Sequence, residues 1–251
     1  MNPRAVVTGA SEGIGRALAL ALGRAGYSVT AVARNAARLE ELMAEMVGDD
    51  HRVVVADLST GEGVAATLAA MKDEHVSLMV NNAAFGAVGD FAELPLDRQV
   101  SMLRVNVEAL TILSHAFLKQ AVAGDHLCNL SSVVAFLPQP AQPVYSATKA
   151  YVTSLTETLW SEARKRGIHV FAVHPGATDT QFAVRAGRTT GRPRPNFVRQ
   201  VPEEVAAEIL RTLEGPWGPH VVTGLPNRLA VALGRLLPRK LLLALVGRVT
   251  R

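Results

Sequence analysis

The chain has 251 residues, of which 49% are hydrophobic, a length and composition that suit one layered α/β domain. Its single cysteine, Cys128, excludes an internal disulfide and argues against structural zinc, so a reducing, cytoplasmic setting is expected. The net charge of +4 arises at the C-terminal end, because the sequence from Pro216 onward has six Lys or Arg residues and no acid. The basic pI therefore gives no reason to expect nucleic-acid binding.

The first residues, "MNPRAVV", lack the apolar core of a signal peptide. No stretch of about 20 apolar residues predicts a membrane-spanning helix. The seven histidines are scattered without metal-ligand spacing, so we predict no catalytic metal.

Short β-branched runs alternate with helical patterns along the chain. Helices are expected at about residues 13–25 and 35–46. The runs predict strands at residues 5–8, 28–33, 52–57, 77–82, 126–131 and 168–174, with 220–224 as a further edge strand. This alternation predicts an α/β fold, a single doubly wound parallel sheet of Rossmann-like type with helices on both faces. Residues 181–200 are rich in Arg, Gly and Pro, break the rhythm and are expected to form a mobile loop with short helical pieces.

The C-terminal extension, residues 226–251, is basic and amphipathic. Pro238 is expected to divide it into two helical pieces. Leu229, Leu233, Leu236 and Leu237 can form one stripe, with Arg228 and Arg235 off it. Such a helix can lie in a membrane interface, pack on another subunit or cap a substrate cleft, and the sequence favours none of these.

The stretch "TGASEGIG", residues 8–15, follows the first expected strand and opens the first helix. In such sheets ligands bind beyond the carboxyl ends of the strands, where a helix N-terminus presents free N–H groups. Gly9, Gly13 and Gly15 would permit a tight turn and the close approach of a pyrophosphate. A Gly-rich turn alone is also typical of a plain strand-to-helix connection.

The end of the second strand bears on the choice of dinucleotide. Ala33 stands where an NAD-binding fold usually places an acid, and Arg34 follows it. A guanidinium suits a 2′-phosphate, so we expect NADP(H) in preference to NAD(H), although Arg34 can also be a solvated loop residue.

In "YSATK", Tyr145 and Lys149 are four residues apart and share one face of a helix. A nearby ammonium favours the phenolate and would lower the phenol pKa, so the pair can exchange a proton with a substrate oxygen. Ser132 follows an expected strand end, where its hydroxyl can bond a carbonyl oxygen, whereas Ser131 is expected to cap a turn. Asn106 is a polar residue in an apolar helical stretch, which calls for a bonding partner or a function.

Together these motifs resemble those of the short-chain dehydrogenase/reductase family over about residues 4 to 182. "TGASEGIG" resembles the cofactor turn, "DL" at 57–58 the adenine contact and "NNAA" at 81–84 the NNAG motif, with Ala84 in place of glycine. "HPGATDT" at 174–180 resembles the PG-x-x-x-T segment beside the nicotinamide. Asn106, Ser132, Tyr145 and Lys149 match the catalytic tetrad in order and spacing.

The resemblance implies a role for each tetrad residue. Tyr145 would be the general acid or base, Lys149 would lower its pKa and bind the nicotinamide ribose, Ser132 would orient the substrate oxygen, and Asn106 would position a relay water. It also implies that residues 1–225 form a catalytic domain with a substrate lid at about 181–200. The cofactor-binding residues expected on this basis are Gly9, Ser11, Gly13, Ile14, Gly15, Arg34, Asp57, Leu58, Asn82, Ala83, Tyr145, Lys149, Pro175, Gly176, Thr178 and Thr180.

Glu12 departs from the pattern, since that position is basic in some NADP-preferring members. Within the lid, an apolar substrate could contact Phe182, Val184, Phe197 and Val198. Five arginines, at 185, 188, 192, 194 and 199, could attract an acidic carrier or simply be solvated.

The sequence as a whole predicts an NADP(H)-dependent oxidoreductase that interconverts a carbonyl and an alcohol on a lipophilic small molecule. A cofactor-binding sensor or scaffold without turnover is the alternative, and a membrane-surface module would rest on the extension alone. The resemblance further implies a homodimer or homotetramer.

Overall fold

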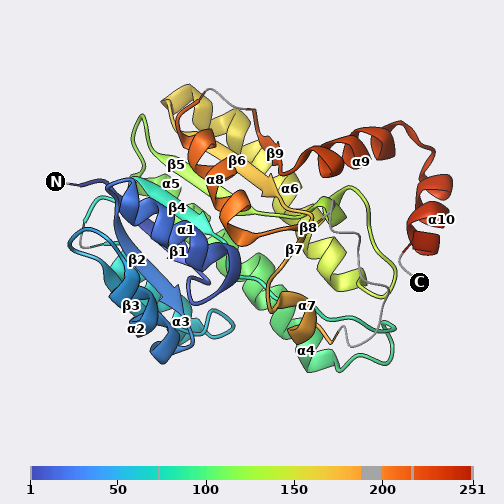
Figure 1. The fold of residues 1–251 in the computed structure, drawn as a ribbon, viewed down its shortest axis with the longest axis horizontal. Helices are drawn as coiled ribbons and strands as arrows, with labels where there is room; N and C mark the ends of the chain where they lie inside the picture. Colours follow the sequence, from blue (N-terminus) through green and yellow to red (C-terminus); the bar gives the residue numbers. More distant parts are fainter. Residues whose placement is uncertain (1, 73, 188–198, 216–217, 250–251) are drawn as a thin grey trace.

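A computed structural model describes residues 2–72, 74–187, 199–215 and 218–249. Its centre is a seven-stranded sheet in the order β3-β2-β1-β4-β5-β6-β9, and every neighbouring pair is parallel (Figure 1). The strands are β1 (Arg4–Thr8), β2 (Ser28–Ala33), β3 (Arg52–Val55), β4 (Leu78–Asn81), β5 (His126–Leu130), β6 (His169–His174) and β9 (His220–Val222). The predicted doubly wound parallel sheet is confirmed, including the edge strand near residue 220.

Helices cover both faces of the sheet. They are α1 (Gly13–Arg24), α2 (Ala36–Glu45), α3 (Gly61–Ala70), α4 (Leu96–Leu103), α5 (Leu110–Gln120), α6 (Pro143–Ala163) and α8 (Pro202–Leu213), with a π-helical stretch, η1 (Arg104–Ala109), between α4 and α5. Helices α1, α2 and α8 contribute to one hydrophobic cluster, and α3, α5 and α6 contribute to a second.

The middle of strand β1 shows why the central strands are mainly apolar. Successive side chains of a strand point to opposite faces, and here Ala5 and Val7 join the first cluster while Val6 joins the second. All three are fully buried, so a polar side chain at any of these three positions would cost packing on one face or the other.

The strand order reverses between β1 and β4, because β1 leads outward to β2 on one side and the later strands continue on the other. In sheets of this kind ligands bind at the carboxyl edge at such a reversal. The turn after β1 and the segment after β4 therefore meet at the position where a ligand site is expected.

The segment predicted as a loop at 181–200 is more structured at its ends than the sequence suggests. A short helix, α7 (Phe182–Arg185), follows Thr180, and β8 (Arg199–Gln200) pairs with β7 (Ala177–Thr178) in a two-stranded sheet that was not predicted. The expected contacts of Phe197 and Val198 and of arginines 188, 192 and 194 fall outside the described residues.

The C-terminal extension forms two helices, α9 (Leu225–Leu236) and α10 (Arg239–Val249), separated at Pro238 as predicted. Figure 1 shows them as an arm that reaches away from the sheet. Within the described ranges, none of the helices has the length and apolar content needed to cross a bilayer.

Two glycines of α3 give a stability test. A Cβ on Gly63 would lie 2.0 Å from the backbone oxygen of Asp57, whereas one on Gly61 would meet nothing within 4 Å. We expect Gly63→Ala to lower the free energy of unfolding by about 1–3 kcal/mol through overpacking. The matched Gly61→Ala should change it by less than about 1 kcal/mol. Urea denaturation followed by circular dichroism measures both, and equal stabilities would contradict this packing.

Candidate active site

A cleft of about 630 Å³ opens at the carboxyl edge of the sheet, within the usual volume range of small-molecule sites. Most of the residues predicted from the sequence line it: Gly9, Ser11, Gly13, Ile14, Arg34, Asp57, Leu58, Asn82, Ala83, Ser132, Tyr145, Lys149, Pro175, Gly176, Thr178 and Thr180. Two predicted residues, Gly15 and Asn106, are not part of the lining. The sequence therefore located the cleft. Gly15 and Asn106 do not line it but contact the residues that form its walls.

The turn after β1 is held by the segment after β4. The Asn82 side-chain amide donates to the backbone oxygens of Thr8 at 2.8 Å and Gly9 at 3.2 Å, and the Thr8 hydroxyl accepts from the backbone N–H of Asn82 and Ala83, each at 3.0 Å. A Cβ on Gly15 would lie 2.3 Å from the Gly9 oxygen. Gly15 is thus required for the close packing of α1 beneath the turn, and its predicted contact with a nucleotide stays a prediction.

The start of α1 has the properties of an anion site. Its first intrahelical bond runs from the Arg16 N–H to the Glu12 oxygen, so the N–H groups of residues 13–15 have no partner within the helix. The first turn carries no acidic residue. Glu12 forms ion pairs with Arg38 on α2 and Arg185 on α7, which offset its charge beside the turn.

At the ends of β2 and β3, Asp57 lies beside Arg34. Asp57 Oδ1 accepts from the Ser59 N–H at 2.9 Å and the Ser59 hydroxyl at 2.7 Å, and its Oδ2 lies 3.7 Å from an Arg34 nitrogen. Burial raises the Asp57 pKa, but the Ser59 hydrogen bonds and the Arg34 charge outweigh burial and hold the pKa below its usual range. Asp57 is therefore ionised near neutral pH. Arg34 is 66% exposed and free to turn toward a ligand.

The two serines after β5 make different contacts. The Ser132 hydroxyl accepts from the Val134 N–H at 3.4 Å, as the cap of the short helix η2 (Val133–Ala135), and donates to the Pro175 oxygen at 3.3 Å. The Ser131 hydroxyl instead donates to the Lys149 backbone oxygen at 2.9 Å. Ser131 therefore anchors α6, and the prediction that it caps a turn is wrong.

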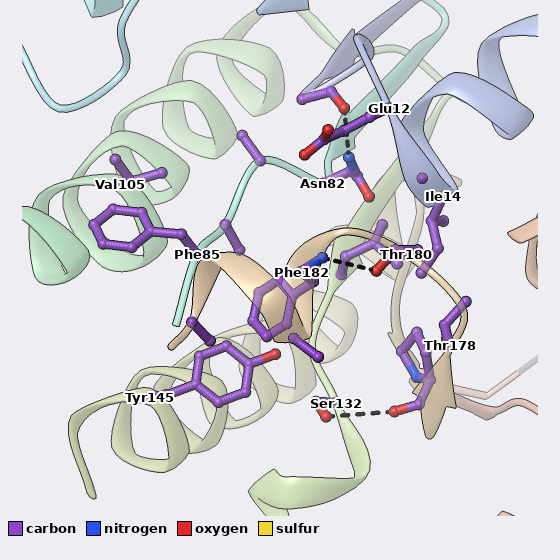
Figure 2. A pocket seen from close by; sticks show the side chains of 18 of the residues that line it. Glu12, Ile14, Asn82, Phe85, Val105, Ser132, Tyr145, Thr178, Thr180 and Phe182 are labelled. Carbon is purple, nitrogen blue, oxygen red and sulfur yellow. Dashed lines mark hydrogen bonds between the residues drawn. The ribbon is translucent and has the colours of Figure 1, made fainter. Parts of the chain in front are cut away.

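Tyr145 and Lys149 are both buried on the same face of α6. The Lys149 Nζ donates to the Leu130 backbone oxygen at 2.6 Å and lies 5.7 Å from the centre of the Tyr145 ring. Figure 2 shows the Tyr145 hydroxyl directed into the pocket, between Phe182 and Ser132. Phenol and ammonium are thus in one cleft with the glycine turn.

The pKa values of this pair are governed by burial. Burial lowers the Lys149 pKa to about 7. Burial also raises the Tyr145 pKa, and a hydrogen bond with Ser132 opposes that rise only in part. The phenol pKa is therefore shifted upward, against the expectation that Lys149 lowers it. Tyr145 is accordingly a neutral proton donor at neutral pH.

Asn106 lies in η1 and is almost fully buried. Its Oδ1 accepts from the Phe85 N–H at 3.1 Å, and its Nδ2 donates to the Phe85 oxygen at 3.0 Å and to the Thr148 hydroxyl at 3.2 Å. A π-helical turn lets one helix carry a polar group inward at such a place. These bonds tie the segment after β4 to α6, and the predicted relay water stays a prediction.

Three polar side chains that were not predicted from the sequence form a hydrogen-bonded chain that begins at the Ser132 backbone. His174 Nδ1 lies 3.4 Å from the Ser132 carbonyl oxygen, which can only accept, so Nδ1 carries the proton. Burial, reinforced by the His220 charge, lowers the His174 pKa to about 3, so the ring is neutral and its Nε2 accepts from His220 Nδ1 at 3.1 Å. His220 Nε2 donates to Glu157 at 2.6 Å. The chain thus runs from the Ser132 backbone through two histidine rings to the Glu157 carboxylate.

The far end of the cleft is mainly apolar. Its lining includes Phe85, Val88, Val105, Val134, Phe182, Val184, Gln139 and Gln142. The Phe182 ring centre lies 5.2 Å from that of Tyr145, and Figure 2 shows Phe85 beside Val105. Phe182 and Val184 were predicted, but the contributions of Phe85 and Val134 depend on the fold of loops that sequence periodicity does not describe.

The low pKa of Lys149 predicts a pH-dependent stability. Because the amine titrates near pH 7 when folded and near 10.5 when unfolded, the unfolded chain binds more protons between these values. This group makes the free energy of unfolding rise with pH from about 7 to 10, by at most about 1.4 kcal/mol per pH unit. In Lys149→Met that part of the rise should disappear. Urea titrations at pH 7, 8, 9 and 10 measure this rise. If the free energy of unfolding changes with pH in the same way for the wild-type protein and Lys149→Met, the amine is not buried.

Comparisons with known proteins identify the family of the chain. A family model described as short chain dehydrogenase matches residues 3–190. The chain is 32% identical to dehydrogenase/reductase SDR family member 11 of Bos taurus over 238 residues, 88% of this chain and 92% of that protein.

Solved structures of dehydrogenases and reductases are also similar to this chain. A short-chain dehydrogenase from Sphingobium yanoikuyae in complex with NADPH superposes with a TM-score of 0.82 at 28% identity, covering 93% of each chain. A 3-ketoacyl-(acyl-carrier-protein) reductase from Brucella melitensis complexed with NADH gives 0.76 at 27% identity, covering 88% of this chain and 96% of that one. With the glycine turn, the seven-stranded sheet and the Ser132, Tyr145 and Lys149 cleft in place, this chain belongs to the short-chain dehydrogenase/reductase family of oxidoreductases.

Proposed function

We propose that the protein is an NADP(H)-dependent oxidoreductase that interconverts a carbonyl and an alcohol on a lipophilic small molecule. The observation that carries the proposal is the buried Tyr145 hydroxyl in the cleft that the glycine turn also lines. Ser132 lines the same cleft and forms a hydrogen bond with Tyr145.

The residues present fit a pyridine nucleotide. A Cβ on Gly9 would lie 2.9 Å from Ala83, and one on Gly13 would lie 3.0 Å from Thr180. The turn therefore has no room for side chains at these two positions. A pyrophosphate could approach the backbone there and reach the N–H groups of α1. Asp57 and Leu58 line the adenosine end, and Pro175, Thr178 and Thr180 line the opposite end. When bound, the nicotinamide would supply or accept the hydride.

The preference for the 2′-phosphate rests on charge. No carboxylate ends β2, and Arg34 is an exposed guanidinium at that position. Glu12, which would repel a phosphate, is already paired with two arginines. Among the structural neighbours, one is a complex with NADPH and another with NADH, which supports a pyridine nucleotide and leaves the preference to these residues.

In carbonyl reduction, the Tyr145 hydroxyl would donate its proton to the carbonyl oxygen of the substrate. The Ser132 hydroxyl would donate a hydrogen bond to the same oxygen and orient it. Lys149, with a pKa near 7, can gain or lose a proton at working pH, so it can restore the Tyr145 proton or stabilise the phenolate. In alcohol oxidation the same groups would act in reverse.

The apolar end of the cleft supports a lipophilic substrate. Phe85, Phe182 and Val134 would contact its hydrocarbon part, and Gln139 and Gln142 offer polar contacts near one edge. Arg185 pairs with Glu12 and Arg199 with Asp179, so these two lid arginines do not favour an acidic carrier. A sensor or scaffold remains the second candidate only if turnover is absent.

The tyrosine offers a direct test with a matched control on the same helix. Tyr145→Phe should lower kcat for reduction of aliphatic and aromatic ketones by NADPH at least about 100-fold, because it removes the proton donor. NADPH binding, followed by fluorescence, should change less than about threefold. Tyr151→Phe, which removes only a surface bond to Thr111, should retain activity. NADPH binding without turnover of any ketone by the wild-type protein would favour the sensor.

The cofactor preference is tested at the end of β2. Arg34→Ala should weaken NADPH binding about tenfold, as expected for loss of about 1.4 kcal/mol from one phosphate contact, and leave NADH binding nearly unchanged. Arg24→Ala, an exposed arginine at the end of α1, is the control. Fluorescence titration gives both constants. Equal losses for the two nucleotides, or tighter NADH binding by the wild-type protein, would overturn the preference.

A further inference from the structure

The outer face of α9 is a row of exposed leucines. Leu225, Leu229, Leu233 and Leu236 are 67%, 56%, 62% and 81% exposed. At about 100° per residue these positions fall in one stripe less than a quarter-turn wide. Large apolar side chains gathered in this way on a surface indicate an interaction site.

The stripe faces away from the body of the protein. The opposite side of α9 carries Val231 and Gly234, which are buried, and a Cβ on Gly234 would lie 2.5 Å from Leu137. Leu242 of α10 is buried beside them, 3.5 Å from the same point. Because α9 is seated by its other face, its leucine stripe cannot also close the substrate cleft, which excludes that expectation for these leucines.

The charges of the arm are of one sign. From residue 216 to the C-terminus the sequence holds six Lys or Arg and no acid. Arg228 pairs with Glu208 of α8, and Arg235 lies over the Phe136 ring at 4.6 Å. Lys240 and Arg248 are exposed on α10. An exposed leucine stripe on one helix, with exposed cations on the next and no acidic residue on either, is the pattern of a segment that lies in the interface of an anionic bilayer.

From this pattern we propose that α9 and α10 dock the protein on an anionic phospholipid surface, with the four leucines entering the acyl boundary. A second copy of the chain fits less well, because a two-fold contact through this arm would bring two acid-free, cationic helices together. A bilayer carrying negative headgroups satisfies the leucines and the cations at once.

The arm also touches the rim of the site. Arg239 donates to the Phe136 backbone oxygen at 3.4 Å, and a Cβ on Gly247 would lie 3.7 Å from Pro140. Gln139, between these two contacts, lines the cleft. Docking through the arm would therefore hold one wall of the cleft close to the bilayer, where lipophilic molecules partition.

Vesicle sedimentation of the full-length protein tests docking independently of any enzymatic activity. The probes are vesicles of phosphatidylcholine alone and with 30% phosphatidylglycerol, each at 0.1 and 0.5 M NaCl. At low salt the bound fraction should be at least tenfold higher on the anionic vesicles, and the higher salt should reduce it. Equal or absent binding of the wild-type protein to both vesicles would overturn the proposal.

Paired variants separate the leucines from general surface hydrophobicity. Leu229→Asp with Leu233→Asp should reduce binding to anionic vesicles at least tenfold, while NADPH binding and circular dichroism stay unchanged. Val47→Asp with Val122→Asp, two exposed apolar residues of the body at 58% and 56%, should bind as the wild type does. If the leucine pair instead splits a dimer in size-exclusion chromatography and leaves vesicle binding unaltered, the stripe is a subunit interface and the proposal fails.

Discussion

The site depends on how α6 is fixed to the end of β5. The Ser131 hydroxyl bonds the backbone of Lys149, and the Lys149 amine bonds the backbone of Leu130, so strand and helix are joined in both directions. These two bonds place Tyr145 over the cleft without any direct hydrogen bond between phenol and amine. They also bury the amine, which is the physical cause of its low pKa.

A second set of polar contacts joins the remaining walls to this helix. Asn106 connects the segment after β4 to Thr148 of α6, and Asn82 connects the same segment to the turn after β1. The catalytic and nucleotide-facing sides of the cleft are therefore one continuous hydrogen-bonded frame. Behind Ser132, the His174, His220 and Glu157 chain extends that frame to the edge strand β9.

The sequence predicted the sheet well because its inner strands are buried on both faces and consist mainly of apolar and β-branched residues, as in β1 and β2. It placed Ser132, Tyr145 and Lys149 because strand ends and helical spacing locate them. It assigned the wrong role to Ser131 because local capping and long-range anchoring use the same side chain. The His174 and His220 contact joins residues 46 positions apart, and no local pattern can reveal such a pairing.

The pKa values and ion pairs of the site were harder to predict from the sequence than the positions of its residues. Spacing alone suggests that Lys149 lowers the Tyr145 pKa, whereas burial in the fold raises it and depletes the charge of the amine. Likewise Glu12 looks unfavourable beside a phosphate until its pairing with Arg38 and Arg185 is seen. Both results depend on the depth of a side chain and on partners distant in sequence.

The central claim is that Tyr145 and Ser132 converge on one substrate oxygen in a cleft shared with the nucleotide. A crystal structure of the ternary complex with NADP⁺ and an alcohol that the protein oxidises tests it most directly. The account predicts the alcohol oxygen within about 2.6–3.2 Å of both hydroxyl oxygens, with the nucleotide phosphates at the start of α1. A nucleotide bound elsewhere, or a Tyr145 hydroxyl turned away from the alcohol, would contradict it.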